Sequence, residues 1–168
     1  FNASITFDQR MYEEDIDGSI AHVTMLGEQG IVTTEEKNQI IEGLEKIREK
    51  VQNGELQFTI EDEDIHMGIE GKLIEEIGEV GKKLHTARSR NDQCQVDTRL
   101  YLKKEIQQLI DRLCYLESVI LDKAEKYADV LTVGFTHIQH AQPITIGFIF
   151  MAYFQMFKRD LERLEDTY

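Results

Sequence analysis

The feature that most constrains this chain is a long interval without glycine or proline. Neither residue occurs between Gly81 and Gly134. Within the interval, apolar residues recur three or four positions apart, which places them on one side of an α-helix. At 1.5 Å per residue, such a helix would exceed about 50 Å and be longer than most globular helices. Because its apolar face is wide, it needs several packing partners, and we expect a bundle of long helices that subunits could share.

Composition narrows the class of protein and of partner. Of the 168 residues, 41% are hydrophobic and 30% are charged, as in a globular chain. The formal net charge of −13 argues against binding to nucleic acid or to an anionic membrane. An anionic small molecule would therefore need arginines, lysines or helix N-termini placed locally around it.

Targeting and redox features indicate an intracellular chain. No apolar run approaches the ~18 residues of a membrane span, and no signal peptide is visible. Cys94 and Cys114 fall in one helical pattern, too far apart along it to form a disulfide. We therefore expect a reduced, cytoplasmic protein.

Other helical patterns lie on both sides of the long interval. Thr33 and Glu36 form a capping-box sequence before one of them. The stretch from about Ile144 is apolar nearly all round, as in a helix at the centre of a bundle. We interpret Val133–Gln142 as a loop and expect Pro143 to start that helix.

With no strand pattern evident, the sequence predicts an all-α fold. We expect a small helical N-terminal domain over residues 1–88. The first, truncated part of a central helix-bundle domain would follow over residues 89–168. A central helix without later partners in sequence suggests an incomplete chain or one that assembles with copies of itself.

The stretch His85–Gln93 concentrates polar groups where a glycine-rich region ends and the long helix begins. It contains two guanidiniums, two hydroxyls, two carboxamides and an imidazole. Arginine binds carboxylates with paired hydrogen bonds, and a helix N-terminus adds N–H groups and partial positive charge. The stretch therefore suits a ligand with several carboxylates. The alternative is a helix cap with two solvated arginines.

A second polar stretch, Thr136–Pro143, interrupts apolar sequence. Imidazole titrates near neutral pH, so a histidine here could transfer a proton, and a neighbouring hydroxyl could hold a carboxylate. His137 and His140 are spaced like a metal pair on a helix, but no further ligand is suitably spaced, and we expect no metal. The alternative is a polar loop that caps the apolar helix.

The acidic run Glu61–Asp64 precedes another apolar helical stripe, and His66 follows in its first turn. Acidic residues suit a helix N-terminus. The residues alone favour a capped, solvated helix start for His66.

Four motifs resemble those of the argininosuccinate lyase family, and in the same order. They occupy residues 1–5 (FNASI), 62–66 (DEDIH), 85–93 (HTARSRNDQ) and 134–143 (GFTHIQHAQP). The resemblance covers nearly the whole chain. It implies the fumarase/aspartase superfamily, whose members are homotetramers on a long-helix bundle with active sites built from several subunits. Members of the argininosuccinate lyase family cleave argininosuccinate to arginine and fumarate without a metal or organic cofactor.

The resemblance also implies roles for single residues. His137 would be the proton-transfer residue, and Arg90 would pair with a substrate carboxylate. Thr86 and Ser89 would support the succinate end of the substrate. The other implied substrate-binding residues are Ser4, Asn91 and Thr136, which would contact argininosuccinate, and Asp64, His66 and Asp8, which would line the pocket.

The implied reaction is a β-elimination, in which a proton leaves the carbon beside a carboxylate and the guanidino nitrogen departs. Negative charge builds on that carboxylate, so fixed arginine, amide and hydroxyl donors would stabilise the transition state selectively. One group must accept the carbon proton and another must protonate the leaving nitrogen. His137 could serve as either.

The sequence departs from the family pattern in three places. Ala87 replaces a usual glycine and would be strained if its φ is positive. Val133 and Phe135 replace the usual proline and tyrosine. The family's mobile serine-containing loop would lie beyond Tyr168, so we expect the fragment to be inactive alone.

Two alternatives remain. The chain could come from a non-catalytic helical scaffold, as some lens crystallins resemble, although the presence of His137 and Arg90 speaks against it. It could also come from a sister lyase that acts on adenylosuccinate, malate or aspartate, although the sequence Arg88–Asp92 favours argininosuccinate.

Overall fold

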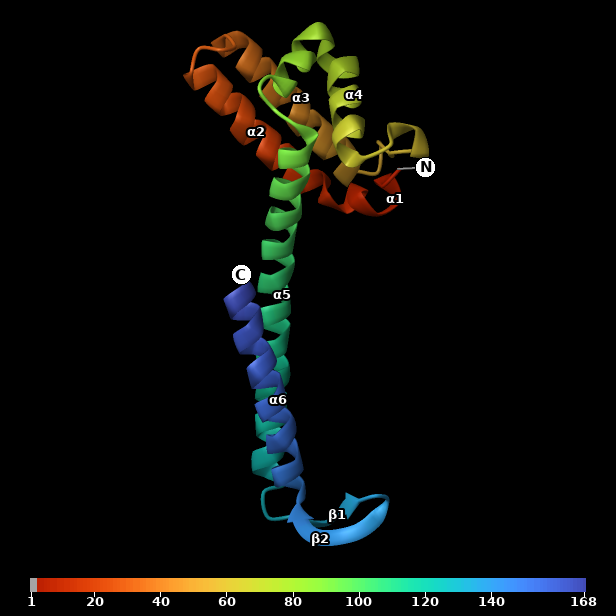
Figure 1. Ribbon diagram of the computed structural model, residues 1–168, viewed down its shortest axis with the longest axis vertical. Helices are drawn as coiled ribbons and strands as arrows, with labels where there is room; N and C mark the ends of the chain where they lie inside the picture. The colour runs from red at the N-terminus through yellow and green to blue at the C-terminus, as the bar shows by residue number, and fades with distance from the viewer. Residues whose placement is uncertain (1–2) are drawn as a thin grey trace. The chain divides into compact units, whose positions relative to one another are not determined.

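A computed structural model describes residues 3–168, which form two compact units. The first extends to Tyr101 and the second comprises Leu102–Tyr168. Helix α5, Arg90–Lys126, begins in the first unit and ends in the second (Figure 1). No helix in the described part of the chain is long and apolar enough to cross a membrane. The domain boundary that we place after residue 88 stays a prediction.

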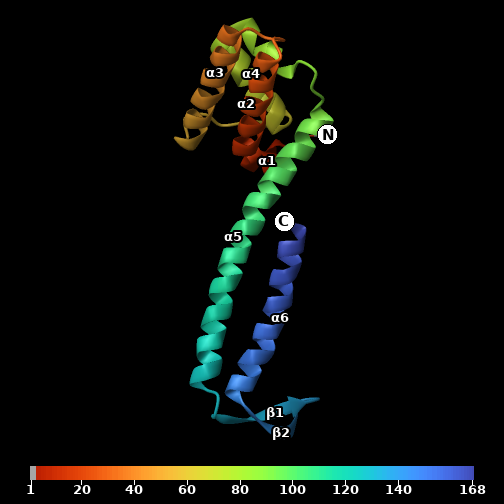
Figure 2. The same ribbon diagram turned by 90° about the vertical axis from the view of Figure 1, so that its left-hand side faces the viewer.

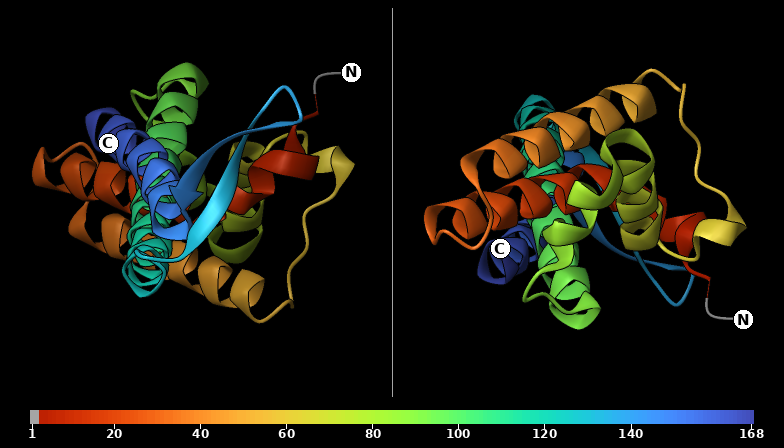
Figure 3. Two further views of the ribbon diagram at one scale, coloured as in Figure 1. Left: turned by 90° about the horizontal axis from the view of Figure 1, so that it is seen from below. Right: turned by 90° about the horizontal axis from the view of Figure 1, so that it is seen from above.

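The first unit is built on three helices, α2 (Tyr12–Glu28), α3 (Thr34–Gln52) and α4 (Ile65–Ile77). They lie against one another, as the view from above shows (Figure 3). Short helical turns connect or flank them: α1 (Ile5–Asp8), η1 (Gln9–Met11), η2 (Ile60–Asp62) and η3 (Gly78–His85).

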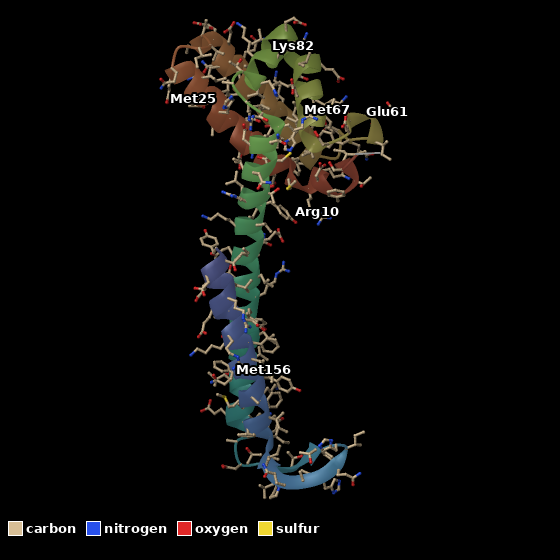
Figure 4. All side chains as sticks on the ribbon, viewed as in Figure 1. Arg10, Met25, Glu61, Met67, Lys82 and Met156 are labelled. Carbon is tan, nitrogen blue, oxygen red and sulfur yellow. The ribbon has the colours of Figure 1, made fainter. Side chains whose placement is uncertain are left out.

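The core of the first unit follows the apolar stripes of these helices. Each helix supplies fully buried aliphatic side chains because its apolar residues recur at helical spacing. The most buried are Ile16, Val23, Leu26, Ile40, Leu44, Ile65, Ile69 and Leu73. Exposed methionines such as Met25 and Met67 lie on the outer faces (Figure 4).

Side-chain caps define where two of the helices begin. The capping box predicted for α3 is confirmed: the Glu36 N–H donates to Thr33 Oγ1 at 3.2 Å, and the Thr33 N–H donates to Glu36 Oε2 at 3.1 Å. At the start of α4, Asp64 Oδ1 accepts from the Met67 N–H at 2.8 Å. Each cap satisfies N–H groups that have no partner inside the helix.

The second unit contains the later part of α5, a β-hairpin and α6 (Ile146–Thr167). Figures 1 and 2 show α5 and α6 running antiparallel. The predicted all-α class is confirmed, as is the long helix, since α5 has 37 residues. The hairpin is a small addition to this helical architecture.

The interpretation of Val133–Gln142 as a loop is wrong. Strands β1 (Leu131–Thr136) and β2 (Gln139–Thr145) pair there in antiparallel fashion, and Pro143 lies opposite Val133 instead of starting a helix. A sheet of two strands consists of edges only, where proline is tolerated. Thr145 caps α6, because its Oγ1 accepts from the Phe148 N–H at 3.1 Å.

The turn of this hairpin explains why the sequence did not reveal it. His137 and Ile138 form a two-residue connection with φ of 50° and 62°. Positive φ at both positions is the mark of a type I′ turn, which normally contains asparagine, aspartate or glycine. Since neither residue belongs to that set, the usual sequence signal is missing.

Candidate functional site

The centre of the candidate site is a contact between Asp64 and Arg90. Arg90 Nη1 donates to Asp64 Oδ2 at 3.0 Å, and the Asp64 side chain is 14% exposed. Asp64 is in place because it caps α4, and Arg90 because it opens α5. The contact joins two of the sequence motifs, and both residues are among those predicted to bind substrate.

Ser4 and Asp8 lie beside this contact. Ser4 Oγ donates to Asp8 Oδ2 at 2.6 Å, and the Ser4 N–H donates to the carbonyl of Glu63 at 2.8 Å. Glu63 directly precedes Asp64 and has a φ of 63°. The N-terminal motif is thereby held against the turn that leads into α4. Phe1 and Asn2 of that motif lie outside the described residues.

The residues before α5 form its cap. Ser89 Oγ accepts from the Asn91 N–H at 3.3 Å, and the Ser89 N–H donates to Asp92 Oδ2 at 3.0 Å. The Asn91 side chain is exposed at this helix start. The stretch therefore presents amide groups and the partial positive charge of a helix N-terminus next to Arg90.

Thr86 and Ala87 lie in the connection between η3 and α5. Thr86 Oγ1 donates to the Lys83 carbonyl at 2.7 Å, while His22 Nε2 donates to the Thr86 carbonyl at 2.9 Å. Ala87 has a φ of 55°, so the condition under which we expected strain at this position is met. An alanine is strained there because its Cβ crowds the backbone.

His66 is buried, which contradicts the solvated helix start favoured by the residues alone. Its side chain is 4% exposed, and its Nδ1 contacts the Oδ2 atoms of Asp15 and, at 3.2 Å, of Asp97. Asp15 and Asp97 are 1% and 0% exposed. An added Cβ on Gly18 would lie 3.3 Å from Asp97 Oδ1, so glycine there permits the close approach of α2 to Asp97.

The ionisable side chains of this cluster shift one another's pKa values. Burial opposes protonation of His66, but the hydrogen bond to Asp15 and the charges of Asp15 and Asp97 outweigh it and raise the imidazole pKa. Burial, and then the charge of Asp15, raise the pKa of Asp97 to about 8. Burial and the mutual repulsion of the carboxylates therefore both favour proton binding to the cluster.

Three polar residues around the cluster were not predicted as site residues. Gln93 Nε2 donates to Asp15 Oδ2 at 2.6 Å, and Arg88 Nη1 donates to Ser19 Oγ at 2.9 Å. Cys94 Sγ lies 3.0 Å from His66 Nε2. Burial and the charge of Asp64 raise the pKa of the Cys94 thiol. Gln93 and Arg88 belong to the predicted polar stretch, but their buried partners are far away in sequence.

The second unit carries the remaining predicted residues. Thr136 ends β1, and His137 follows in the hairpin turn, with both side chains exposed. His140 lies on β2, where its ring meets that of Phe135 edge to face with centroids 5.1 Å apart. The hairpin therefore separates His137 and His140, which a helix would have brought together as a metal pair.

Comparison with curated proteins shows that this chain is similar to argininosuccinate lyases. The chain is 55% identical over 168 residues to an argininosuccinate lyase from Alkaliphilus metalliredigens and 53% identical to one from Sulfurimonas denitrificans. Both alignments cover 100% of this chain and 36% of the relative. The chain thus spans about a third of the length of these relatives.

Solved structures share the fold. A variant of EDDS lyase with bound fumarate is 30% identical, with a TM-score of 0.80 over 95% of this chain and 31% of that one. A fumarate lyase:delta crystallin from Brucella melitensis has a TM-score of 0.79 over 99% of this chain and 43% of that one. At 18% identity, the second likeness shows the fold alone. A family described as Lyase matches residues 1–168, so the motifs, the helices and the relatives agree that this chain belongs to the lyase family.

Proposed function

We propose that this chain is the N-terminal part of an argininosuccinate lyase, which splits argininosuccinate into arginine and fumarate by β-elimination. The observation that carries the proposal is the 55% identity over the entire chain to a relative of that name. The contacts among Ser4, Asp8, Asp64 and Arg90 support it, since these residues come from three separate motifs.

In the proposed site, Arg90 binds a carboxylate of the substrate. A guanidinium has five N–H donors, and the contact with Asp64 uses Nη1. The substrate carboxylate either shares the guanidinium with Asp64 or displaces it. Asn91, Ser89 and Thr86 would add donors near the N-terminus of α5, where negative charge is stabilised.

Ser4, Asp8 and His66 complete the proposed lining in the first unit. Ser4 offers a hydroxyl whose position is fixed by Asp8. His66 lies two residues after Asp64, held by Asp15. A rigid set of donors lowers the cost of ordering the site when the transition state forms.

Proton transfer is assigned to His137, with Thr136 as the neighbouring hydroxyl that contacts the substrate. Imidazole is suited to this step because it exchanges protons near neutral pH. The second acid or base group would come from the remainder of the longer protein. The proposed elimination needs no metal or organic cofactor, because side chains of these kinds can transfer both protons and stabilise the developing charge.

A chimera tests this function directly. The chain replaces the equivalent part of the relative from Alkaliphilus metalliredigens, and fumarate release from argininosuccinate is followed by ultraviolet absorbance. We expect turnover comparable with that of the intact relative, and no turnover by the 168-residue chain alone. Fumarate release by the isolated chain would contradict its assignment as an incomplete enzyme.

Two controls separate the alternatives. His137→Asn in the chimera should reduce turnover by orders of magnitude while leaving assembly unchanged. If the chimera assembles but acts on adenylosuccinate, malate or aspartate instead, the chain belongs to a sister lyase. If it assembles and acts on none of these substrates, a scaffold role replaces the catalytic one.

We also propose that the parent protein is a cytoplasmic homotetramer. Apolar side chains exposed on the helices of the second unit support self-assembly, because burial of such side chains against another subunit is favourable. Met156 on α6 is one of them (Figure 4). The others on α5 and α6 include Leu109, Tyr115, Leu116, Phe148 and Tyr153. Light scattering of the chimera would measure the oligomeric state.

A further inference from the structure

The first unit buries three side chains of the kinds that bind metal ions. Asp15 comes from α2, His66 from α4 and Asp97 from α5, and one potential ligand atom from each lies within 4.8 Å of the others. All three are at least nine-tenths buried. Their convergence from three helices makes the geometry a property of the tertiary fold.

Three of the four carboxylate oxygens in this cluster lack donors. Both Asp97 oxygens and Asp15 Oδ1 are buried without a hydrogen-bond partner. Unpaired buried carboxylate oxygens are costly, since burial removes their hydration. Asp97 Oδ2 points toward the His66 ring, 3.2 Å from Nδ1. A positive charge between these oxygens, either a shared proton or a metal cation, would offset the cost of burying them.

We propose that Asp15, His66 and Asp97 form a binding site for a divalent transition-metal ion of the zinc class. One imidazole nitrogen and two carboxylates suit zinc or cobalt, whereas magnesium and calcium prefer oxygen ligands alone. Ligand atoms about 2.1 Å from a tetrahedral ion lie about 3.4 Å apart. The separation of Nδ1 from Asp97 Oδ2 is close to that value, and the shorter contact with Asp15 lengthens when the ion replaces the proton.

The surroundings provide room for a fourth ligand. A small crevice beside the cluster is lined by Ser19, Arg88 and Gln93 together with Asp15 and His66. Its volume of about 10 Å³ is enough for a single water molecule. Arg88, which lines this crevice, donates to Ser19 Oγ, and neither oxygen of Asp97 receives a hydrogen bond.

The proposed elimination needs no metal, although this site shares His66 with the proposed substrate lining. It can be tested on the 168-residue chain itself. The chain is treated with EDTA, dialysed, and titrated with Co²⁺ while visible absorption reports inner-sphere coordination; Zn²⁺ binding is measured by calorimetry. We expect one equivalent of either ion per chain, with a dissociation constant in the micromolar range or below.

Matched variants locate the bound ion. Asp97→Asn should weaken Co²⁺ binding at least tenfold. Asp122→Asn removes an exposed carboxylate from the same helix and should leave binding unchanged. His140→Gln removes one of the two exposed histidines of the hairpin and should also have no effect. Equal binding by the Asp97→Asn variant and the unaltered chain, or a loss confined to His140→Gln, would overturn the proposal.

A measurement on the unaltered chain covers the case in which Asp97→Asn fails to fold. Paramagnetic Co²⁺ should shift or broaden the amide NMR signals of Asp15, His66 and Asp97 at one equivalent. Signals that change only in the hairpin, or only at millimolar Co²⁺, would identify an adventitious ion and refute the site.

Discussion

Arg90 Nη1 lies 3.0 Å from Asp64 Oδ2, so two residues that we expect to bind the substrate already bind each other. An arginine held by a partly buried carboxylate has fewer conformations to lose when a second carboxylate arrives. The pair therefore orients Arg90 for binding while leaving further N–H donors of the guanidinium for the substrate.

The first prediction distinguishes substrate binding by Arg90 from a contribution of Arg90 to the stability of the fold. In the chimera, Arg90→Lys should lower kcat/KM for argininosuccinate about a hundredfold, because lysine cannot make the paired contact with a carboxylate. The same change in the 168-residue chain should cost at most about 1 kcal/mol of unfolding free energy, since the pair is partly solvated. Steady-state kinetics and urea unfolding measure the two effects, and a parallel loss in both would argue for a structural role alone.

The second prediction concerns pH. The pKa of Asp97 is raised to about 8 in the folded chain, above its ordinary value of 3.8. The folded state therefore retains a proton that the unfolded state releases, and stability falls as pH rises from about 4 to 8. The raised pKa of His66 acts in the same direction, because the stability it contributes is lost as pH rises through that pKa.

Asp97→Asn should flatten this dependence. One proton accounts for a slope of at most about 1.4 kcal/mol per pH unit. Urea midpoints of the EDTA-treated chain at pH 5 and pH 8.5 should therefore differ less in the variant than in the unaltered chain. Asp122→Asn serves as the control, and an unchanged slope in Asp97→Asn would show that another group titrates.

The third prediction uses the left-handed backbone at Ala87. With φ at 55°, Ala87→Gly should raise the unfolding free energy by about 1 kcal/mol, because glycine adopts this conformation without the clash of a Cβ. The same substitution at Ala21, which is exposed within α2, should lower it by a similar amount. Thermal unfolding of both variants would reveal the opposite signs.

The fourth prediction concerns the first turn of α6. An added Cβ on Gly147 would lie 2.6 Å from the Ala124 carbonyl oxygen and 2.7 Å from Ala128 Cα, which belong to backbone that cannot easily move. Gly147→Ala should therefore cost about 1–3 kcal/mol.

Gly71 provides the matched control for that change. A Cβ there would meet no atom within 4 Å, so Gly71→Ala should stabilise α4 by up to about 1 kcal/mol. Circular dichroism during thermal unfolding compares the two variants. Equal effects of the two substitutions would show that the close approach at Gly147 is relieved by a backbone shift.

Local patterns explain what the sequence predicted correctly. The glycine-free interval indicated that α5 is unusually long, and the spacing of Thr33 and Glu36 indicated where α3 starts, because both features depend on residues within one helix. The two polar stretches were located by composition alone. The assignment of roles within them came from the family resemblance and stays a prediction.

Long-range contacts explain what the sequence did not reveal. The burial of His66 depends on Asp15, 51 residues earlier, and on Asp97 in another helix. No periodicity within α4 contains that information. The hairpin was missed for a different reason: its turn places His137 and Ile138 in a conformation that their types rarely adopt.

Asp97 and Arg90 lie seven positions apart on α5, close to two helical turns. Inserting or deleting one residue between them would rotate one relative to the other by about 100°. Either the buried acid would leave His66, or the guanidinium would leave Asp64. Descendants of this sequence can therefore exchange exposed side chains between these two positions, but the number of residues separating them should stay fixed.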